Sequence, residues 1–309
     1  MAVLKKNLLV PSSDGIHKLS GVAFYPEEAK KGFFHVVHGM TEHIGRYEKF
    51  MREMAEAGYI CFGYDNLGHG NTALDDGELG YIAPKNGWKY LVKDVKVFSD
   101  AVFEAFGRNN LPYILMGHSM GSFIVRLATA KHVKPDKLIV MGTGGANPAA
   151  DAGLALITCI KAIRGERHFS PLVDKLAFGS YNKHFGGGSK EDPKPWLTND
   201  EAVRNRYYLD KYCSFNFSVS AMGDLIRLMK YSNNEDWYWN MPSDMSVLFV
   251  SGEEDPVGNY GKGVTAVSEA LKREVSYVKC ILYEGARHEI LNDFTYEAVK
   301  KDILAFCEK

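Results

Sequence analysis

The feature that most constrains the fold is a regular alternation of short apolar segments with amphipathic ones. We expect buried strands at residues 33–39, 59–65, 113–119, 137–142, 246–252 and 278–285, and helices near 46–58, 88–106, 119–131, 261–272 and 294–306. Strands that are apolar throughout and alternate with helices predict a mostly parallel sheet covered by helices on both faces. The sequence therefore predicts an α/β fold.

Two stretches depart from this alternation. The first strands, "NLLV" and "LSGVAFYP", flank "PSSDGIHK" and predict a β-hairpin that turns at Asp14 and Gly15. Residues 143–244 separate two sheet strands and are too long for a plain loop. We interpret 143–244 as a helical cap, or lid, inserted into a core made of residues 1–142 and 245–309.

Composition excludes several classes of protein. Hydrophobic residues make up 46% of the chain and charged residues 24%, with a net charge of −1, so no nucleic-acid partner is expected. The five cysteines are scattered without a C-x-x-C pair, which argues against a disulfide framework or a zinc site. No cofactor is expected. The N-terminal stretch lacks the apolar region of a signal peptide and no window resembles a membrane span, so the expected location is the cytoplasm.

The segment "YILMGHSMGS" joins an expected strand to an expected helix through Ser119. Gly117 and Gly121 place no Cβ beside that turn, as a sharply bent backbone requires. The arrangement predicts a nucleophile elbow, in which a serine hydroxyl is raised above the sheet. A loop that happens to read G-x-S-x-G is the alternative, so the rest of the chain has to decide.

A serine hydroxyl becomes a good nucleophile when an imidazole removes its proton and a carboxylate orients that imidazole. Ser119, Asp255 and His288 each follow an expected strand, and ligands of parallel sheets bind beyond the carboxyl ends of the strands. His288 is the one histidine of ten that follows the strand after the acid. The chain order Ser, acid, His is that of the α/β-hydrolase sheet.

The acid is less sharply defined than the other two residues. "SGEEDPV" offers Glu253, Glu254 and Asp255. Asp255 is favoured because it lies farthest into the turn, with Pro256 fixing the backbone behind it; Glu254 is the second choice.

An oxyanion formed during attack on a carbonyl requires preorganised backbone N–H donors. We expect one from Met120, the residue after the nucleophile, and the other from Met40, in the loop after "HVVHG". His38 is expected to form hydrogen bonds within that loop. His43, His69 and Glu42 are expected to hold loops together near the site and to take no catalytic part. A metal site made of His38, His43 and His69 is an alternative that no ligand spacing supports.

Five ordered motifs resemble those of the monoacylglycerol lipase and lysophospholipase branch of the α/β-hydrolases. They are "HGMTEHIGRY", "YDNLGHGNT", "GHSMGS", "SGEEDPVG" and "YEGARHEILND", and the similarity extends from about residue 20 to 305. The resemblance implies the α/β-hydrolase fold, a triad of Ser119, Asp255 and His288, and oxyanion amides at Met40 and Met120. One departure is Leu67, at a position where relatives usually have an arginine, and it puts only the local packing in doubt.

The function expected from these residues is hydrolysis of a carboxylic ester of one fatty acyl chain, through an acyl-enzyme. Two alternatives stay open: an aminopeptidase or iminopeptidase, which would need acidic cap residues for the substrate amine, and a ligand-binding protein without turnover. Candidate cap acids are Asp174, Glu191, Asp192, Asp200 and Glu201. An epoxide hydrolase or dehalogenase would have aspartate at the elbow.

The expected partner is a small acyl ester. We also expect a peripheral contact with a lipid surface. The cap would make it through the apolar segment 149–163 and the basic residues that follow, Arg164 and Arg167. The sequence leaves the oligomeric state open.

Overall fold

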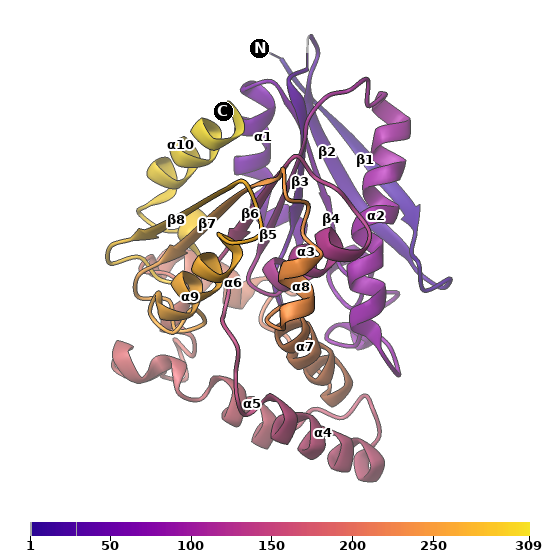
Figure 1. The fold of residues 1–309 in the computed structure, drawn as a ribbon. Helices are drawn as coiled ribbons and strands as arrows, with labels where there is room; N and C mark the ends of the chain where they lie inside the picture. Colours follow the sequence, from indigo (N-terminus) through magenta and orange to yellow (C-terminus); the bar gives the residue numbers. More distant parts are fainter. Residues whose placement is uncertain (1, 29) are drawn as a thin grey trace.

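The computed structural model describes residues 2–28 and 30–309, and its centre is one eight-stranded sheet (Figure 1). The strands are β1 Val3–Pro11, β2 Lys18–Pro26, β3 Gly32–Val37, β4 Tyr59–Tyr64, β5 Tyr113–His118, β6 Lys137–Met141, β7 Ser246–Gly252 and β8 Tyr277–Tyr283, in the spatial order β1-β2-β4-β3-β5-β6-β7-β8. The strands from β3 to β8 pair in parallel, and β1 and β2 are antiparallel additions. The predicted α/β class is confirmed.

Helices cover both faces of this sheet. They are α1 Glu48–Glu56, α2 Gly87–Phe106, α3 Met120–Lys131, α4 Ala150–Arg164, α5 Pro171–Phe178, α6 Glu201–Leu209, α7 Val219–Tyr231, α8 Glu235–Trp239, α9 Lys262–Leu271 and α10 Tyr296–Cys307. Buried side chains of α1 and α10 pack on one face, and those of α2, α3 and α9 pack on the other. Every strand from β3 to β7 is therefore shielded from solvent on both sides.

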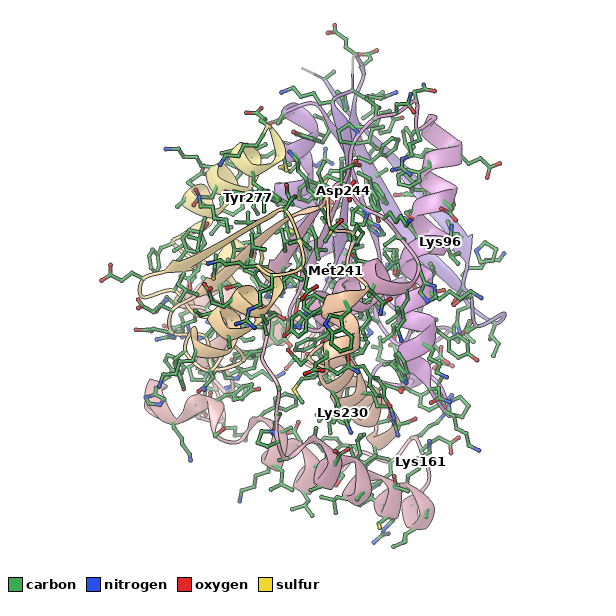
Figure 2. All side chains as sticks on the ribbon, in the orientation of Figure 1. Lys96, Lys161, Lys230, Met241, Asp244 and Tyr277 are labelled. Atoms are coloured by element: carbon green, nitrogen blue, oxygen red, sulfur yellow. The ribbon has the colours of Figure 1, made fainter. Side chains whose placement is uncertain are left out.

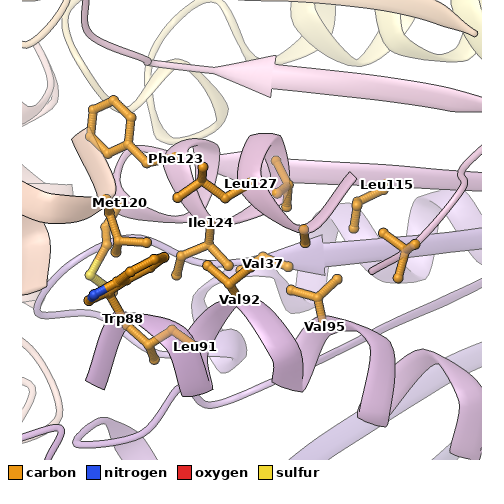
Figure 3. Packing of buried hydrophobic residues seen from close by; sticks show 14 of the residues in the cluster. Val37, Trp88, Leu91, Val92, Val95, Leu115, Met120, Phe123, Ile124 and Leu127 are labelled. Carbon is orange, nitrogen blue, oxygen red and sulfur yellow. The ribbon is translucent and has the colours of Figure 1, made fainter. Parts of the chain in front are cut away.

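The apolar strands alternate their side chains between these two layers. Phe33 of β3 joins the cluster that contains α2 and α3, whereas its neighbour Phe34 joins the cluster that contains α1 and α10. Figure 3 shows how α3 is held: Ile124 and Met120 face Trp88 of α2 within the buried apolar cluster. This packing fixes the N-terminus of α3, where Ser119 lies.

The predicted hairpin is present. β1 and β2 pair antiparallel up to Pro11 and Lys18, and the chain turns between them with Gly15 at φ +76°. Asp14 Oδ1 accepts hydrogen bonds from the backbone N–H groups of Ile16 and His17, which closes the turn.

The segment between β6 and β7 carries five helices, α4 to α8. Helix α7 packs against α2 and α3 of the core, and α4 packs on α7, so α4 and α5 form an outer layer at the bottom of Figure 1. Lys230 of α7 forms an ion pair with Asp151 of α4, and Lys161 of α4 donates to the carbonyl of Pro84; Figure 2 labels both lysines. The domain bounds themselves stay a prediction, and residues 1 and 29 of the predicted core lie outside the described part.

Within the described ranges, no helix is both long enough and apolar enough to cross a bilayer.

Candidate active site

Ser119 lies at the junction of β5 and α3 in a conformation that side chains rarely adopt. Its φ of 53° and ψ of −119° fall outside the usual regions, at a cost of order 1–3 kcal/mol. A Cβ on Gly121 would clash with the carbonyl of Val37, and a Cβ on Gly117 would clash with the carbonyl of Gly121. The two glycines therefore allow the tight turn that the motif predicts.

Asp255 and His288 form a buried pair beyond β7 and β8. Nδ1 of His288 lies 2.8 Å from Oδ2 of Asp255, and the residues are 3% and 0% exposed. The backbone N–H of Val257 donates to the other carboxylate oxygen at 2.8 Å, which fixes the orientation of the carboxylate. With Nδ1–H donating to Asp255, Nε2 is the nitrogen that remains able to accept a proton.

The competing acids are placed differently. Glu254 has a side chain 49% exposed and lies 3.9 Å from Arg287, and Glu253 is also exposed. Of the three carboxylates in this turn, Asp255 is thus the one that contacts His288.

His288 lies next to the carboxyl ends of β5, the strand that Ser119 follows, and of its neighbour β6. The backbone N–H of Ser119 donates to the carbonyl of Met141 at 3.0 Å, and Gly142 follows with φ +57°. A Cβ on Gly142 would lie 3.2 Å from Cε1 of His288, so the imidazole packs on the glycine backbone. The three predicted triad residues thus gather at the carboxyl edge of the sheet. Their catalytic roles stay predictions.

A segment of the expected cap covers His288. The ring of Trp196, in the 3-10 helix Pro195–Leu197, lies 5.2 Å from the imidazole, centroid to centroid. The backbone also joins the two segments, since the N–H of Glu289 donates to the carbonyl of Leu197 at 2.7 Å. Trp196 therefore shields the Asp255–His288 pair from water on this side.

The loop after β3 passes directly over Ser119. A Cβ on Gly39 would lie 3.0 Å from the Cβ of Ser119, which places the next amide, that of Met40, beside the serine. Met120 is the first residue of α3, so its N–H has no acceptor within the helix. Both amides thus lie close to Ser119, and their role as oxyanion donors stays a prediction.

Glu42 holds this loop from within the protein. Its Oε1 accepts from the N–H of Gly39 at 2.6 Å and from the hydroxyl of Tyr47 at 2.9 Å. Arg46 donates to Glu42 Oε2 at 2.9 Å and forms two bonds of 2.7 Å with Glu289, the residue after His288. One buried ionic network therefore joins the loop after β3 (residues 38–43, here called the oxyanion loop) to the loop that carries His288.

The network also reaches the residue before the nucleophile. Nδ1 of His118 lies 3.2 Å from Glu42 Oε1 and 2.8 Å from the Tyr47 hydroxyl. Burial alone lowers the pKa of His118, but the hydrogen bond and charge of Glu42 outweigh it and raise that pKa above 6.5. Burial alone raises the pKa of Glu42, but His118 and Arg46 hold it well below 4.5. An anionic Glu42 is thus stabilised by its surroundings.

The other histidines of the motifs have structural contacts. Nδ1 of His38 donates to the carbonyl of Gly39, and its Nε2 accepts from the N–H of Asn66. Burial lowers the pKa of His38. His69 Nε2 accepts from the N–H of Thr41, and burial lowers its pKa to about 3. These bonds show His38 and His69 holding the loops together, as expected.

Leu67, the departure from the family motif, is fully buried in the core that contains α2 and α3. It thus replaces the expected arginine with apolar packing.

Sequence reasoning missed Arg46 and Glu289. One signal was available: Glu42 and Arg46 are four residues apart, a spacing typical of ion pairs on a helical turn. The pairing with Glu289, 243 residues away along the chain, has no local signal.

A mostly parallel eight-stranded sheet, with a serine elbow after β5, an acid after β7 and a histidine after β8, defines an α/β-hydrolase. The model of the family described as serine aminopeptidase, S33, matches residues 28–295, and the chain belongs to that family.

Individual relatives agree with this class. The chain is 32% identical to monoglyceride lipase of Homo sapiens over 106 residues, which are 34% of this chain and 32% of that protein, so the match spans about a third of the relative. A thermostable carboxyl esterase from Bacillus coagulans, solved in complex with glycerol, superimposes with a TM-score of 0.90 at 27% identity, over 100% of this chain and 98% of that one. A monoglyceride lipase from Saccharomyces cerevisiae, solved with a substrate analog, has a TM-score of 0.77 at 18% identity, over 99% and 94% of the two chains, and supports the fold alone.

Proposed function

We propose that the protein is a serine ester hydrolase that cleaves carboxylic esters of a single fatty acyl chain, of the monoacylglycerol or lysophospholipid type. The observation that carries the proposal is the buried Asp255–His288 pair beside a serine in a strained elbow conformation. The relatives named as a carboxyl esterase and monoglyceride lipases support the substrate class.

The reaction has two halves. Nε2 of His288 takes the proton of Ser119 as its Oγ attacks the ester carbonyl, and Asp255 stabilises the imidazolium. The N–H groups of Met40 and Met120 donate to the oxyanion. The tetrahedral intermediate collapses, and His288 returns the proton to the leaving alcohol, which leaves an acyl ester on Ser119. Water then attacks that ester with His288 as base, releasing the carboxylic acid and restoring the serine.

The apolar character of the side chains that follow Ser119 supports an acyl substrate. Met120 and Phe123 of α3 belong to the same hydrophobic cluster as Ile157 of α4 and Met222 of α7. A chain bound among such side chains gains about 0.8 kcal/mol for each buried methylene, or up to about fourfold in kcat/KM. Chain-length selectivity is therefore the expected signature.

The outer helices support a contact with lipid. Ile163 of α4 is 79% exposed, and Leu172 and Leu176 of α5 are also exposed. Apolar side chains that face solvent on two adjoining helices are suited to a lipid surface. Arg164 lies at the end of α4 as expected, whereas Arg167 stacks on Tyr81, 3.7 Å from the ring centroid, and so contributes less to a headgroup contact.

The peptidase alternative is favoured only by the name of the family model. Two of the acids it would need have other partners, because Asp192 pairs with Arg204 at 2.9 Å and Asp200 caps α6 through the N–H of Val203. Asp174, Glu191 and Glu201 remain as candidates for an amine contact.

The test is a rate series on 1-acylglycerols and p-nitrophenyl esters from acetyl to long acyl chains, with triacylglycerols and aminoacyl anilides run in parallel. We expect kcat/KM to rise with chain length and monoacylglycerols to be cleaved faster than triacylglycerols, because second and third chains would have to enter beneath the cap. Ser119→Ala is the blank. A flat profile with rapid anilide cleavage would assign the protein to the peptidases, and no turnover of any substrate would favour the ligand-binding alternative.

A further inference from the structure

Three metal-binding side chains meet where the oxyanion loop touches the segment after α6. His43 precedes the 3-10 helix Ile44–Tyr47, Asp210 directly follows α6, and Cys213 comes three residues later. One nitrogen, one oxygen and one sulfur atom from these residues all lie within 4.8 Å of one another. Across the described ranges, this is the one such group of three.

The distances can be compared with those of a tetrahedral zinc site. Bonds of about 2.0 Å to nitrogen and oxygen and about 2.3 Å to sulfur place ligand atoms about 3.3–3.6 Å apart. Nε2 of His43 and Oδ2 of Asp210 are 2.9 Å apart, already close to that spacing. The sulfur, which lies within 4.8 Å of the other two atoms, has to approach by about 1 Å.

Further contacts orient the three ligands. Oδ1 of Asp210 accepts from the N–H of Tyr212 at 2.9 Å, and the N–H of Cys213 donates to the carbonyl of Asp210 at 3.0 Å. The ring of Tyr212 lies 5.8 Å from that of His43, edge to face. Such contacts fix the orientation of metal ligands in proteins. The side chains of His43 and Asp210 are 19% and 35% exposed, so an ion can enter from solvent.

The charges also suit a divalent cation. A thiolate and a carboxylate together balance two positive charges, and imidazole with thiolate selects zinc-like metals over magnesium or calcium. An ion that binds the Cys213 sulfur displaces the thiol proton. Arg46 and Lys194 are nearby cations, and the charge of Arg46 is already balanced by Glu42 and Glu289.

We propose that His43, Asp210 and Cys213 form a binding site for a thiophilic divalent cation, Zn²⁺ above all, with the fourth position left to water. The ion would join the oxyanion loop to the segment after α6. Hydrogen bonds already link these parts, because the N–H of Ser214 donates to the carbonyl of Thr41 at 3.2 Å and the Thr41 hydroxyl lies 2.7 Å from that of Tyr207. Bound Zn²⁺ would restrict the loop that carries Met40.

The test uses Co²⁺ added to the reduced, full-length chain, because a thiolate bound to cobalt produces a near-ultraviolet charge-transfer band. We expect the band to saturate at one equivalent, to disappear when Zn²⁺ is added, and to be absent in Cys213→Ser. Cys159→Ser, which changes an exposed cysteine on α4, is the matched control and should keep the band. Zn²⁺ should also raise the Tm of the wild type and of this control.

His43→Gln keeps the Cys213 thiol and replaces Cys213→Ser as the test variant if that protein does not fold. We expect His43→Gln to weaken Co²⁺ binding at least tenfold. The proposal is wrong if the wild type has no band, if the band survives Cys213→Ser, if Cys159→Ser removes it, or if His43→Gln binds Co²⁺ as tightly as the wild type. These readouts do not depend on ester hydrolysis, so the metal site and the proposed function are tested separately.

Discussion

Oδ2 of Asp255 lies 2.8 Å from Nδ1 of His288, and neither side chain is open to solvent. A buried carboxylate in this position selects the imidazole tautomer with a free Nε2 and stabilises the imidazolium that forms during the reaction. Glu254, one residue earlier, faces solvent near Arg287.

Asp255→Asn should therefore lower kcat by about 10³-fold or more, because the amide cannot stabilise the imidazolium and favours the wrong tautomer. Glu254→Gln is the matched control, and its kcat should stay within about twofold, since the side chain is partly exposed. Steady-state hydrolysis of a p-nitrophenyl ester measures both. If Glu254→Gln were the more damaging change, the acid would belong one residue earlier.

The strands and the predicted triad were accessible to sequence reasoning for one geometric reason. Parallel strands have their carboxyl ends at one edge, so Ser119, Asp255 and His288 could be expected together once their strands were recognised. The glycines beside Ser119 marked the turn, because only a residue without Cβ fits there.

Other parts of the site depend on packing that no local pattern encodes. Arg46 forms an ion pair with Glu289, which is 243 residues away in the sequence. Trp196 contacts His288 from a segment whose position depends on how helices α4 to α8 pack on the core. Arg167 stacks on Tyr81, a contact between segments far apart in the sequence that no local pattern predicts, and its expected place at a lipid surface stays a prediction.

Glu42 acts as a positioning residue, because it contacts Gly39 and His118 and not the reacting atoms. Glu42→Gln should lower kcat about tenfold or more with KM within about threefold, as expected for a lost hydrogen bond to a charged group. Glu48→Gln, which changes a more exposed glutamate on α1, is the control. Equal losses in kcat for both variants would contradict the positioning role.

The same variant has a pH signature in stability. The raised pKa of His118 stabilises the fold fully below pH 6.5, and that contribution is lost as pH rises through the raised value. The lowered pKa of Glu42 stabilises the folded state above pH 4.5, and that contribution is lost as pH falls through the lowered pKa. The difference in unfolding free energy between wild type and Glu42→Gln should therefore be widest between about pH 4.5 and 6.5, as measured by urea denaturation across pH. A difference that does not vary with pH would contradict the coupling.

Asp224 of α7 provides a test outside the site. Burial raises its pKa from 3.8 to about 6, so the folded state binds the proton more tightly and stability falls as pH rises between these values. Asp224→Asn should remove this loss and raise the free energy of unfolding by about 2–3 kcal/mol at pH 7, relative to its effect at pH 3.5. Asp151→Asn, which changes an exposed aspartate on α4, is the control for the substitution itself. A pH-independent effect of Asp224→Asn in urea denaturation would be inconsistent with a raised pKa.

The central claim is that Ser119 is the nucleophile for ester hydrolysis, and covalent labelling with a fluorophosphonate tests it most directly. Intact-protein mass and peptide mapping should find one adduct per chain, on Ser119, and hydrolysis of a monoacylglycerol should be lost at the same rate as the adduct forms. Ser119→Ala should fold, take no label and lose at least about 10³-fold in kcat/KM. Full labelling of Ser119 with hydrolysis unchanged, or near-normal turnover by folded Ser119→Ala, would contradict the account.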